Sequence, residues 1–370
     1  MSRVTKNTFW LTLTITFLVV SCDNNAKQID KTAASLKYLG EVVLSHGDLL
    51  LSSYAIANYV VGQDSLLVYD QQSKQLVLFD LQRKIPIYTI DVVLDGPDFF
   101  DPLFQDAEIR NDSLFLLSRK FFSVYNLDGK ILMRFGHDEL GVQKLTALIN
   151  DFHLSDNTVI FSKVPVDVLA PNFRSPEKPN IFFTLNLLTR SVSEIEVFSP
   201  KESLIEDMDK GYYNDFAFHS MAVSKDSIIY SFPFSSKTYL LDLANNKQTE
   251  LETPFKSVEN LRVPINANEI NEGNWANYAY SSSRFSGIER DSKTGYFVRV
   301  ALKVEKVANA ENKDYRYLML INDKFEVVEE IKLPGMLFIE PVVSNGIIYL
   351  FKGGDISEGG YLFVAYEIVT

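Results

Sequence analysis

A short polar turn followed by apolar runs recurs along the chain, and this repetition constrains the fold more than any other feature. Each turn is marked by an Asp or Asn that precedes Ser, Asn or Gly: Asp64, Asp112, Asp156, Asp226, Asp291 and Asn345. Successive markers lie 44 to 70 residues apart, about 56 on average. This spacing is typical of propeller blades with loop insertions and exceeds the period of leucine-rich or hexapeptide solenoids.

Each repeated unit can be divided into short runs rich in Val, Ile, Leu, Phe and Tyr, with turn residues between them. In the first complete unit the runs are Tyr54 to Val61, Leu66 to Tyr69, Gln75 to Phe79 and Ile85 to Val92. Such composition and length are typical of β-strands, and no long segment after the N-terminal leader shows helical periodicity. The sequence therefore predicts an all-β fold built from four-stranded antiparallel blades.

The two ends of the repeat region predict that the ring closes on itself. After Asn345 the last unit has the runs Ile347 to Phe351 and Tyr361 to Val369, which leaves its sheet one strand short. Leu36 to Leu44 stands before the first complete unit and has no partner within a unit of its own. Pairing the two would remove exposed strand edges. We therefore expect a six-bladed β-propeller in which the N-terminal strand completes the last blade.

The Asp-Ser turns have a simple conformational explanation, because Asp and Ser side chains bond to their own backbone and stabilise tight reversals. Asp-Ser followed by an aliphatic residue also resembles a bacterial O-glycosylation signal, as at Ser65, Ser113 and Ser227. The two explanations are compatible with each other.

The first 21 residues resemble a lipoprotein signal peptide. Arg3 and Lys6 precede a short run of apolar residues and threonines, Phe9 to Val20, which is too short for a stable membrane span. The run ends at Val-Val-Ser-Cys, which resembles a bacterial lipobox, and Cys22 is the only cysteine of the chain. We expect cleavage before Cys22, acylation of its thiol and a flexible tether over 22–34. Residues 35–370 would then form a single propeller domain.

The charge of the chain disfavours nucleic acid as a partner. The net charge of −12 becomes −14 once the two positive charges of the leader are removed, and no basic cluster offsets it. An exported chain with one cysteine has no internal disulfide, so burial must supply its stability. We expect a location in the bacterial cell envelope, attached to a membrane through the lipid and facing the periplasm or the exterior.

The long insertions are predicted to lie on one face of the ring. In a four-stranded meander the links between strands one and two and between three and four share one face, and these links are short here. The long segments belong to the other face: 94–103, 165–180, 199–213, 253–278 and 304–314. Long loops on a rigid scaffold commonly carry recognition. Aromatic residues and one arginine in them are the predicted binding residues: Phe99, Phe100, Phe173, Arg174, Tyr212, Tyr213, Trp275 and Tyr278. The alternative is that these side chains pack onto the blades as local cores.

Catalytic motifs are weak. The chain has no Gly-rich phosphate loop, HExxH or Gly-x-Ser-x-Gly motif, and its four histidines are scattered over different units. Polar residues five to seven positions before the turn markers could instead face a central channel: Asn58, Asp106, Asn150, His219 and Glu340. Of these, Asp106, Asn150 and Glu340 are the candidate ligands of a Ca²⁺ ion in an alternative hydrolase, because hard cations prefer such oxygen ligands. Any propeller, however, needs polar residues along a water-filled channel.

Together, the lipobox, the six units and the expected end-to-end closure resemble an uncharacterised family of six-bladed β-propeller lipoproteins of bacterial envelopes. The resemblance implies an envelope location and brings no catalytic residue with it, since fold alone does not define function. The favoured hypothesis is a lipid-anchored, non-catalytic binding or scaffolding module without a cofactor, which recognises an envelope protein or a glycan through its long-loop face. The alternative is a calcium-dependent, lactonase-like propeller hydrolase with a polar channel.

Overall fold

A computed structural model describes most of the chain after its first 33 residues. The described residues are 34–49, 51, 55–61, 64–70, 72–142, 147–165, 180–198, 210–211, 220–224, 226–233, 235–258, 265–266, 283–305, 313–335, 340–355 and 359–370. Their regular secondary structure consists of β-strands. Within these ranges, no helix is present that could cross a membrane.

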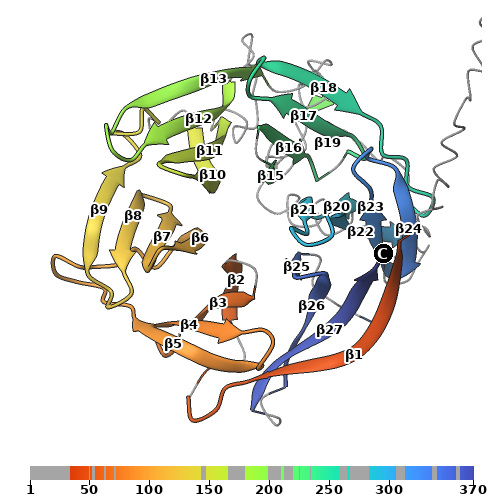
Figure 1. Cartoon of the computed structure of the whole chain (residues 1–370), viewed down its shortest axis with the longest axis horizontal. Coiled ribbons are helices and arrows are strands. Elements are labelled where there is room, and N and C mark those ends of the chain that lie inside the picture. Colours follow the sequence, from red (N-terminus) through yellow and green to blue (C-terminus); the bar gives the residue numbers. More distant parts are fainter. Residues whose placement is uncertain are drawn as a thin grey trace, which may run out of the picture. The chain divides into compact units, whose positions relative to one another are not determined.

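Six small antiparallel sheets stand in a ring, which confirms the predicted six-bladed propeller (Figure 1). Blade 1 contains β2 (Ala55–Val61), β3 (Ser65–Asp70), β4 (Gln75–Asp80) and β5 (Ile85–Asp91). Blade 2 contains β6 (Phe104–Arg110), β7 (Ser113–Ser118), β8 (Phe121–Asn126) and β9 (Ile131–Gly136). Blade 3 contains β10 (Ala147–Ser155), β11 (Thr158–Pro165), β12 (Asn180–Asn186) and β13 (Val192–Phe198). The first strand of each of these blades lies nearest the axis and the fourth lies outermost.

The second half of the ring follows the same plan with two variations. Blade 4 contains β15 (Ser220–Ser224), β16 (Ser227–Ser231), β17 (Thr238–Asp242) and β18 (Lys247–Leu251). Blade 5 has a divided inner strand and contains β20 (Arg284–Phe285), β21 (Glu289–Arg290), β22 (Phe297–Glu305), β23 (Lys313–Ile321) and β24 (Val327–Lys332). Blade 6 contains β25 (Pro341–Ser344), β26 (Ile347–Asp355), β27 (Gly360–Val369) and β1 (Ser35–Ser45). A short ladder joins β14 (Lys210–Gly211) to β19 (Ile265–Asn266).

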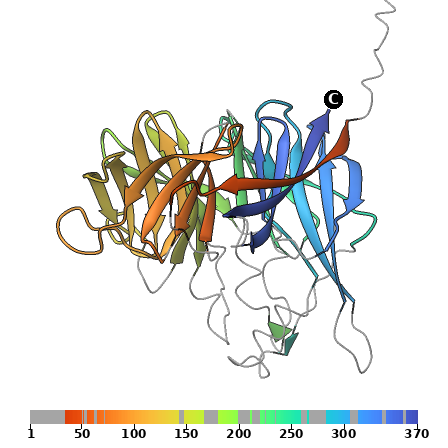
Figure 2. The ribbon, with the colours of Figure 1, turned by 90° about the horizontal axis from the view of Figure 1, so that it is seen from below.

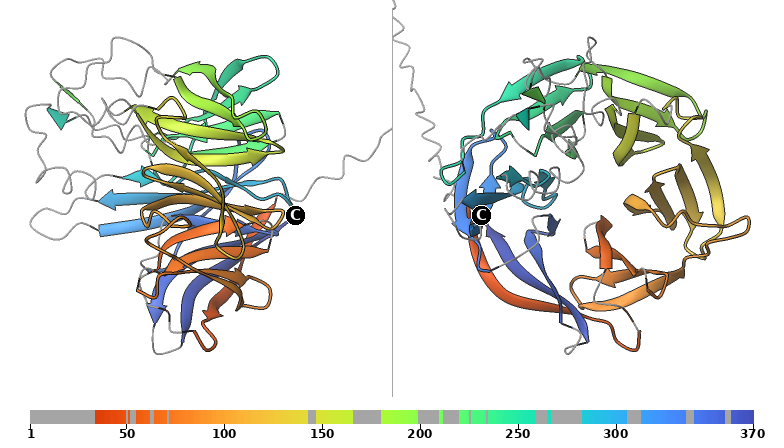
Figure 3. Two further views of the ribbon diagram at one scale, coloured as in Figure 1. Left: turned by 90° about the vertical axis from the view of Figure 1, so that its left-hand side faces the viewer. Right: turned by 180° about the vertical axis from the view of Figure 1, so that it is seen from behind.

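The predicted closure is present. Strand β1 pairs antiparallel with β27 from Ser35↔Val369 to Ser45↔Gly360, with one β-bulge between Tyr38 and Gly40. Figure 2 shows β1 running along the outside of the ring, and Figure 3 shows it as the outermost strand of blade 6. The first strand of the domain therefore completes the sheet formed by its last three strands, and neither has a free edge at the join.

The apolar runs are buried because each blade packs between two others. In β3 the sequence LLVY alternates: Leu66 and Val68 pack with blade 6, whereas Leu67 and Tyr69 pack with blade 2. All four side chains are at most 4% exposed. A central blade strand is covered on both faces, so both sets of its side chains must be apolar.

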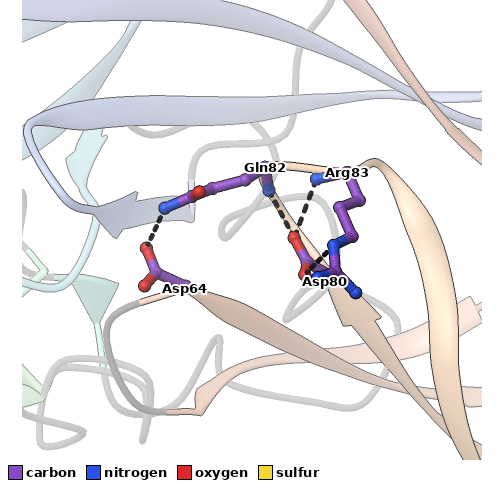
Figure 4. A network of polar contacts seen from close by, with 4 residues as sticks. All are labelled: Asp64, Asp80, Gln82 and Arg83. Carbon is purple, nitrogen blue, oxygen red and sulfur yellow. Dashed lines mark hydrogen bonds and ion pairs between the residues drawn. The ribbon is translucent and has the colours of Figure 1, made fainter.

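The recurring polar turns form two structural classes. All six markers lie in or next to the turn between the first and second strands, and Asp112, Asp156 and Asn345 have positive φ angles of 57°, 50° and 57°. Asp and Asn tolerate this left-handed conformation better than most residues. The turns between strands three and four begin with another Asp or Asn, whose side chain accepts backbone N–H bonds. In blade 1, Asp80 Oδ1 accepts from the amides of Gln82 and Arg83, both at 2.8 Å (Figure 4).

These turns also connect neighbouring blades. The Gln82 side chain donates to Asp64 Oδ1 over 3.1 Å within blade 1, and the Asn345 amide of blade 6 donates to the same oxygen (Figure 4 shows the first contact). Asp291 of blade 5 accepts from the Gly346 amide of blade 6 over 2.9 Å. The repeated residues therefore hold both their own turns and the contacts between blades.

Candidate binding cavity on the propeller axis

The inner strands of blades 2 to 6 line a cavity of about 810 Å³. The cavity runs along β6, β10, the start of β15, β21 and β25, so it follows the axis around which the blades stand. Its lining is mixed, with several carboxyl groups, two arginines and a histidine beside smaller and apolar residues. A volume of this size is in the range of small-molecule sites.

One register position recurs around this cavity. It lies four residues before the last paired residue of the inner strand, and is occupied by Ala57, Asp106, Asp151, Ser220 and Glu340 in blades 1, 2, 3, 4 and 6. In blades 2 and 3 the preceding residue, Gln105 or Asn150, forms a β-bulge. Bulges change the direction of a side chain and are common beside functional sites.

Side chains at this position connect successive blades. In blades 2, 3 and 4 this side chain accepts a hydrogen bond from a backbone amide of the next blade, as follows: Phe152 N to Asp106 Oδ2 at 3.1 Å, Met221 N to Asp151 Oδ2 at 3.2 Å, and Ile288 N to Ser220 Oγ at 3.0 Å. The inner strand of a blade has no neighbouring strand on the side of the axis. The backbone amides on that side therefore need another hydrogen-bond acceptor, and these side chains supply it. The same bonds hold the carboxyl groups in place at the cavity wall.

The side chains of Asp106 and Asp151 interact with each other. Burial and the neighbouring Asp151 raise the pKa of Asp106 well above its usual range, and burial also raises the pKa of Asp151. The protonated Asp106 carboxyl donates to the Asp151 carboxylate, which stabilises the charged form of Asp151. Two buried carboxyl groups in contact cannot both ionise at low cost. The pair therefore keeps its last proton to a higher pH than a free aspartate does.

Glu289 adds a third carboxyl group from blade 5. Burial, with a smaller contribution from the charge on Asp151, raises the pKa of Glu289 to about 8. Its carboxyl group lines the cavity and makes no hydrogen bond with any described residue. Glu289 is therefore largely protonated at neutral pH and is available to a ligand.

A second group of charged residues lies along β6 and β10. Arg110 donates to the Leu154 carbonyl over 2.9 Å and pairs with Glu108 over 3.7 Å. Burial raises the pKa of Glu108, whereas burial and the Arg110 charge lower the pKa of His153 to about 4. His153 is consequently neutral at physiological pH. It can act as a neutral hydrogen-bonding group but not as a cation.

The structure brings the three candidate calcium ligands into the same cavity, since Asp106, Asn150 and Glu340 all line it. Two of them already make hydrogen bonds within the protein. Asp106 bonds to Asp151 and to the amides of Ala107 and Phe152. Asn150 Oδ1 accepts a hydrogen bond from Ser162 Oγ over 2.7 Å. Among the described residues, no group of three or more His, Cys, Asp or Glu side chains could hold a metal ion. The cavity as it stands does not fit a metal centre built from such groups.

The described part of the long-loop face corrects the expectation for Phe100. This residue is 1% exposed and stacks on Tyr125 at 4.0 Å between ring centroids. Its segment is held to blade 2 by a bond from the Tyr125 hydroxyl to the Phe99 carbonyl at 2.8 Å. Phe100 is therefore a core residue, as the alternative interpretation allowed. Phe99 is partly exposed, and the Arg134 guanidinium lies 3.9 Å from its ring centroid.

The other predicted recognition residues lie outside the described residues, namely Phe173, Arg174, Tyr212, Tyr213, Trp275 and Tyr278. The same holds for Cys22 and His219, and nothing is described of the Asn58 side chain. Their proposed roles remain predictions.

Three carboxyl groups that line the cavity were missed in the sequence: Glu108, Asp151 and Glu289. Asp151 follows Asn150 directly, and the bulge at Asn150 determines how these adjacent side chains are presented. Glu289 lies in the divided inner strand of blade 5, two residues before its turn marker, and so it falls outside the spacing used to find channel residues. The sequence signal that could have identified Asp151 is the recurrence of a polar residue five positions before Asp156 and six before Asp112.

Solved structures with similar folds include proteins from several bacteria. No family model matches the chain, and no curated protein matches its sequence. A member of the DUF4221 family from Bacteroides vulgatus superposes with a TM-score of 0.71 at 14% identity, covering 90% of this chain and 98% of that chain. A candidate exported protein from Bacteroides fragilis gives a TM-score of 0.53 at 11% identity, with coverages of 91% and 96%. A calcium-binding protein, regucalcin, from Agrobacterium tumefaciens gives 0.48 at 10% identity, covering 90% and 95%. The first two similarities support the propeller fold, and at such low identities they say nothing of the function of this chain.

Proposed function

We propose that this protein is a lipid-anchored binding module of a bacterial envelope that takes a glycan into its axial cavity. The observation that carries the proposal is a roomy cavity whose wall carries carboxyl, amide and hydroxyl side chains, which between them offer hydrogen-bond donors and acceptors. Hydroxyl-rich ligands need such paired donors and acceptors, because each buried hydroxyl must be satisfied. The long-loop face, where the sequence places most aromatic candidates, would bind the remainder of the glycan or an accompanying protein.

The envelope location rests on the N-terminal sequence. The short apolar leader and the lipobox ending at Cys22 are typical of exported, acylated proteins. The structural neighbour from Bacteroides fragilis is also described as exported, which agrees with this proposal. A tether over 22–34 would let the propeller stand away from the membrane surface.

Replacing Cys22 by serine should abolish lipid labelling and release the protein from the membrane fraction, because the hydroxyl cannot replace the thiol in the acylation reaction. Metabolic labelling with a radioactive or clickable fatty acid, followed by fractionation, measures both effects. Asn25→Ser, in the expected tether after the cysteine, leaves both the lipobox and the thiol in place and is the control for a substitution near the cleavage site. Labelling that persists in Cys22→Ser would show that the lipid is attached elsewhere.

Blocking the cavity should abolish glycan binding. Glu340 is exposed just before β25 and lines the cavity, so the larger side chain in Glu340→Trp would take up part of the cavity. We expect at least about a tenfold loss of affinity in a glycan array followed by calorimetry, equivalent to about 1.4 kcal/mol. Leu188→Trp, at a position 74% exposed in the turn between β12 and β13, is the control for surface tryptophan. Full affinity in Glu340→Trp would place the ligand outside the cavity.

The calcium-dependent hydrolase remains the second candidate, favoured by the meeting of Asp106, Asn150 and Glu340 in one cavity. Against it stands the finding that the described acidic and histidine side chains form no metal-binding group. A calcium-dependent rise in melting temperature that is lost in Glu340→Gln would support this candidate over the binding module.

A further inference from the structure

We propose that Arg316, near the start of β23 in blade 5, is the centre of a binding site for an oxyanion, namely a carboxylate or sulfate group. The site lies apart from the axial cavity, whose lining contains neither Arg316 nor its neighbour Arg284. The proposal is therefore independent of the glycan-binding function. It rests on a buried guanidinium group with unused hydrogen-bond donors.

Blade 5 has two buried arginines among its described residues, and they differ in how their donors are satisfied. Arg299 is completely buried and donates to three backbone carbonyls. Arg316 is 9% exposed, and its Nε and Nη1 atoms are buried without a hydrogen-bond partner. A buried charged group normally has a partner, because its lost hydration must be replaced. The two unused donors of Arg316 therefore indicate a missing acceptor.

The register of blade 5 places a second arginine in the same row as Arg316. Arg284 of β20 and Arg316 of β23 both pair with Leu302 of β22, which lies between them (Figure 1). Paired residues of antiparallel strands present their side chains on the same face of the sheet, and strands two apart are separated by about 10 Å. Leu318 and Leu320 follow Arg316 at two-residue spacing and pack with blade 6. The two arginines therefore belong to the face of the sheet that is turned toward blade 6.

The charges around Arg316 leave it without a counterion in contact. Burial lowers the pKa of Arg316, while the charge on Asp314 raises it and the charge on Arg284 lowers it. Asp314 is exposed and accepts no hydrogen bond from Nε or Nη1 of Arg316. Arginine keeps its charge at physiological pH. An anion beside Arg316 would satisfy the buried donors and also reduce the repulsion between the two arginines.

The backbone of Arg316 is held on both sides, so its side chain starts from a fixed position. Arg316 pairs with Leu302 on one side, and on the other its carbonyl accepts a hydrogen bond from the Leu333 amide over 2.8 Å. A binding residue on a central strand is positioned more precisely than one on a loop. Binding therefore requires little ordering of the protein backbone.

A carboxylate or sulfate group has the chemistry that this site lacks. Its oxygens accept several hydrogen bonds and carry the opposite charge, and the planar guanidinium group suits such acceptors. A neutral hydroxyl group could accept from one donor, but it would leave the positive charge of Arg316 uncompensated. The site should therefore select an acidic ligand over a neutral ligand of the same shape.

The test compares methyl β-D-glucuronide with methyl β-D-glucoside, which has a hydroxymethyl group in place of the carboxylate, and compares sulfate with chloride at equal ionic strength. Calorimetry and thermal unfolding are performed on the mature protein at pH 7. We expect the glucuronide or sulfate to bind and to raise the melting temperature, whereas the glucoside and chloride do not. Arg316→Met should weaken anion binding at least tenfold. Arg119→Met, at an exposed position between β7 and β8, should bind as wild type does.

The stability of the ligand-free variants gives a second, independent result. Because Arg316→Met removes a buried charge that lacks a partner, it should leave the melting temperature of the ligand-free protein unchanged or raise it. Arg299→Met removes a satisfied donor and should lower the melting temperature. A lower melting temperature in Arg316→Met would show that the protein itself supplies the acceptor, and this would overturn the proposal. Binding of neither anion to the wild type, or undiminished binding to Arg316→Met, would overturn it as well and leave the glycan-binding function of the axial cavity standing.

Discussion

Replacing Arg299 by methionine is expected to lower the free energy of unfolding by about 3 to 5 kcal/mol. The Arg299 side chain of β22 is completely buried between blades 4 and 5. It donates to three backbone carbonyls, those of Ser286 at 3.1 Å, Ser235 at 3.0 Å and Phe232 at 2.8 Å. Methionine would fill much of the volume of the arginine side chain. The three buried carbonyls, however, would lose the hydrogen-bond donors that Arg299 supplies.

Arg299 is charged as well as buried, which explains why its replacement should cause a large loss of stability. Burial lowers its pKa to about 9, so the guanidinium is still charged at neutral pH, and its carbon lies 4.5 Å from the Phe285 ring centroid. Three carbonyl dipoles and one aromatic face therefore replace water around a cation. Lysine cannot reach three separate carbonyls with the same planar fork, and Arg299→Lys should lose most of the same stability.

The measurement is chemical denaturation of the mature protein, followed by tryptophan fluorescence and circular dichroism. Arg290→Met is the matched control, because Arg290 lies in the same blade but is exposed. We expect that control to stay within about 0.5 kcal/mol of the wild type. A loss below about 1 kcal/mol in Arg299→Met would mean that water or another donor takes over the three carbonyls.

A methyl group at Gly360 should open the ring where its two ends meet. Gly360 pairs with Ser45 at the end of the β1–β27 ladder. A Cβ atom there would overlap Cγ1 of Val43 and lie 2.6 Å from the Leu44 carbonyl oxygen. Because one of these atoms belongs to the backbone of β1, the closing strand itself must shift. We expect Gly360→Ala to cost about 3 kcal/mol or more and to increase proteolysis within β1.

The neighbouring Gly359 provides the control for this prediction. It has a φ angle of 65°, and no atom lies within 4 Å of the position that a Cβ would occupy there. Gly359→Ala should therefore lower the free energy of unfolding by only about 1 kcal/mol, the cost of a residue with a side chain in the left-handed backbone conformation. Thermal unfolding and time-resolved proteolysis would compare the two variants. If Gly360→Ala and Gly359→Ala lose similar stability, the β1–β27 junction can adapt and is not a rigid closure.

Much of the fold could be predicted because its signals are local. The order of apolar runs and polar turns follows from the two-residue period of strands and from the conformations that Asp and Asn accept, and these act within a few residues. Even the pairing of Leu36 to Leu44 with the last unit follows from counting strands, and the register Leu44↔Tyr361 confirms it. The prediction that Phe100 is a binding residue was wrong, because an aromatic side chain suits a binding surface and a hydrophobic core equally well.

The candidate site could be predicted only in part. Asp106 and Glu340 were found from their distance to a turn, which the meander keeps nearly constant. Asp151 lies within the same distance of its turn as its neighbour Asn150, and the spacing alone does not tell which of the two is held at the bulge against the next blade, whereas Glu289 belongs to an inner strand that is divided into two pieces. Bulges and breaks depend on how neighbouring blades pack, and a linear pattern does not contain that information.

The amino-acid sequence by itself determined the class of fold, the number of blades and the closure by the first strand, because strand periodicity and turn chemistry are properties of neighbouring residues. Only the tertiary structure decided which carboxyl groups meet on the axis and which of their pKa values are raised. The pKa values of Asp106, Asp151 and Glu289 are raised by burial, and those of Asp106 and Glu289 also by the charge on Asp151, which lies on another blade and far away in the chain.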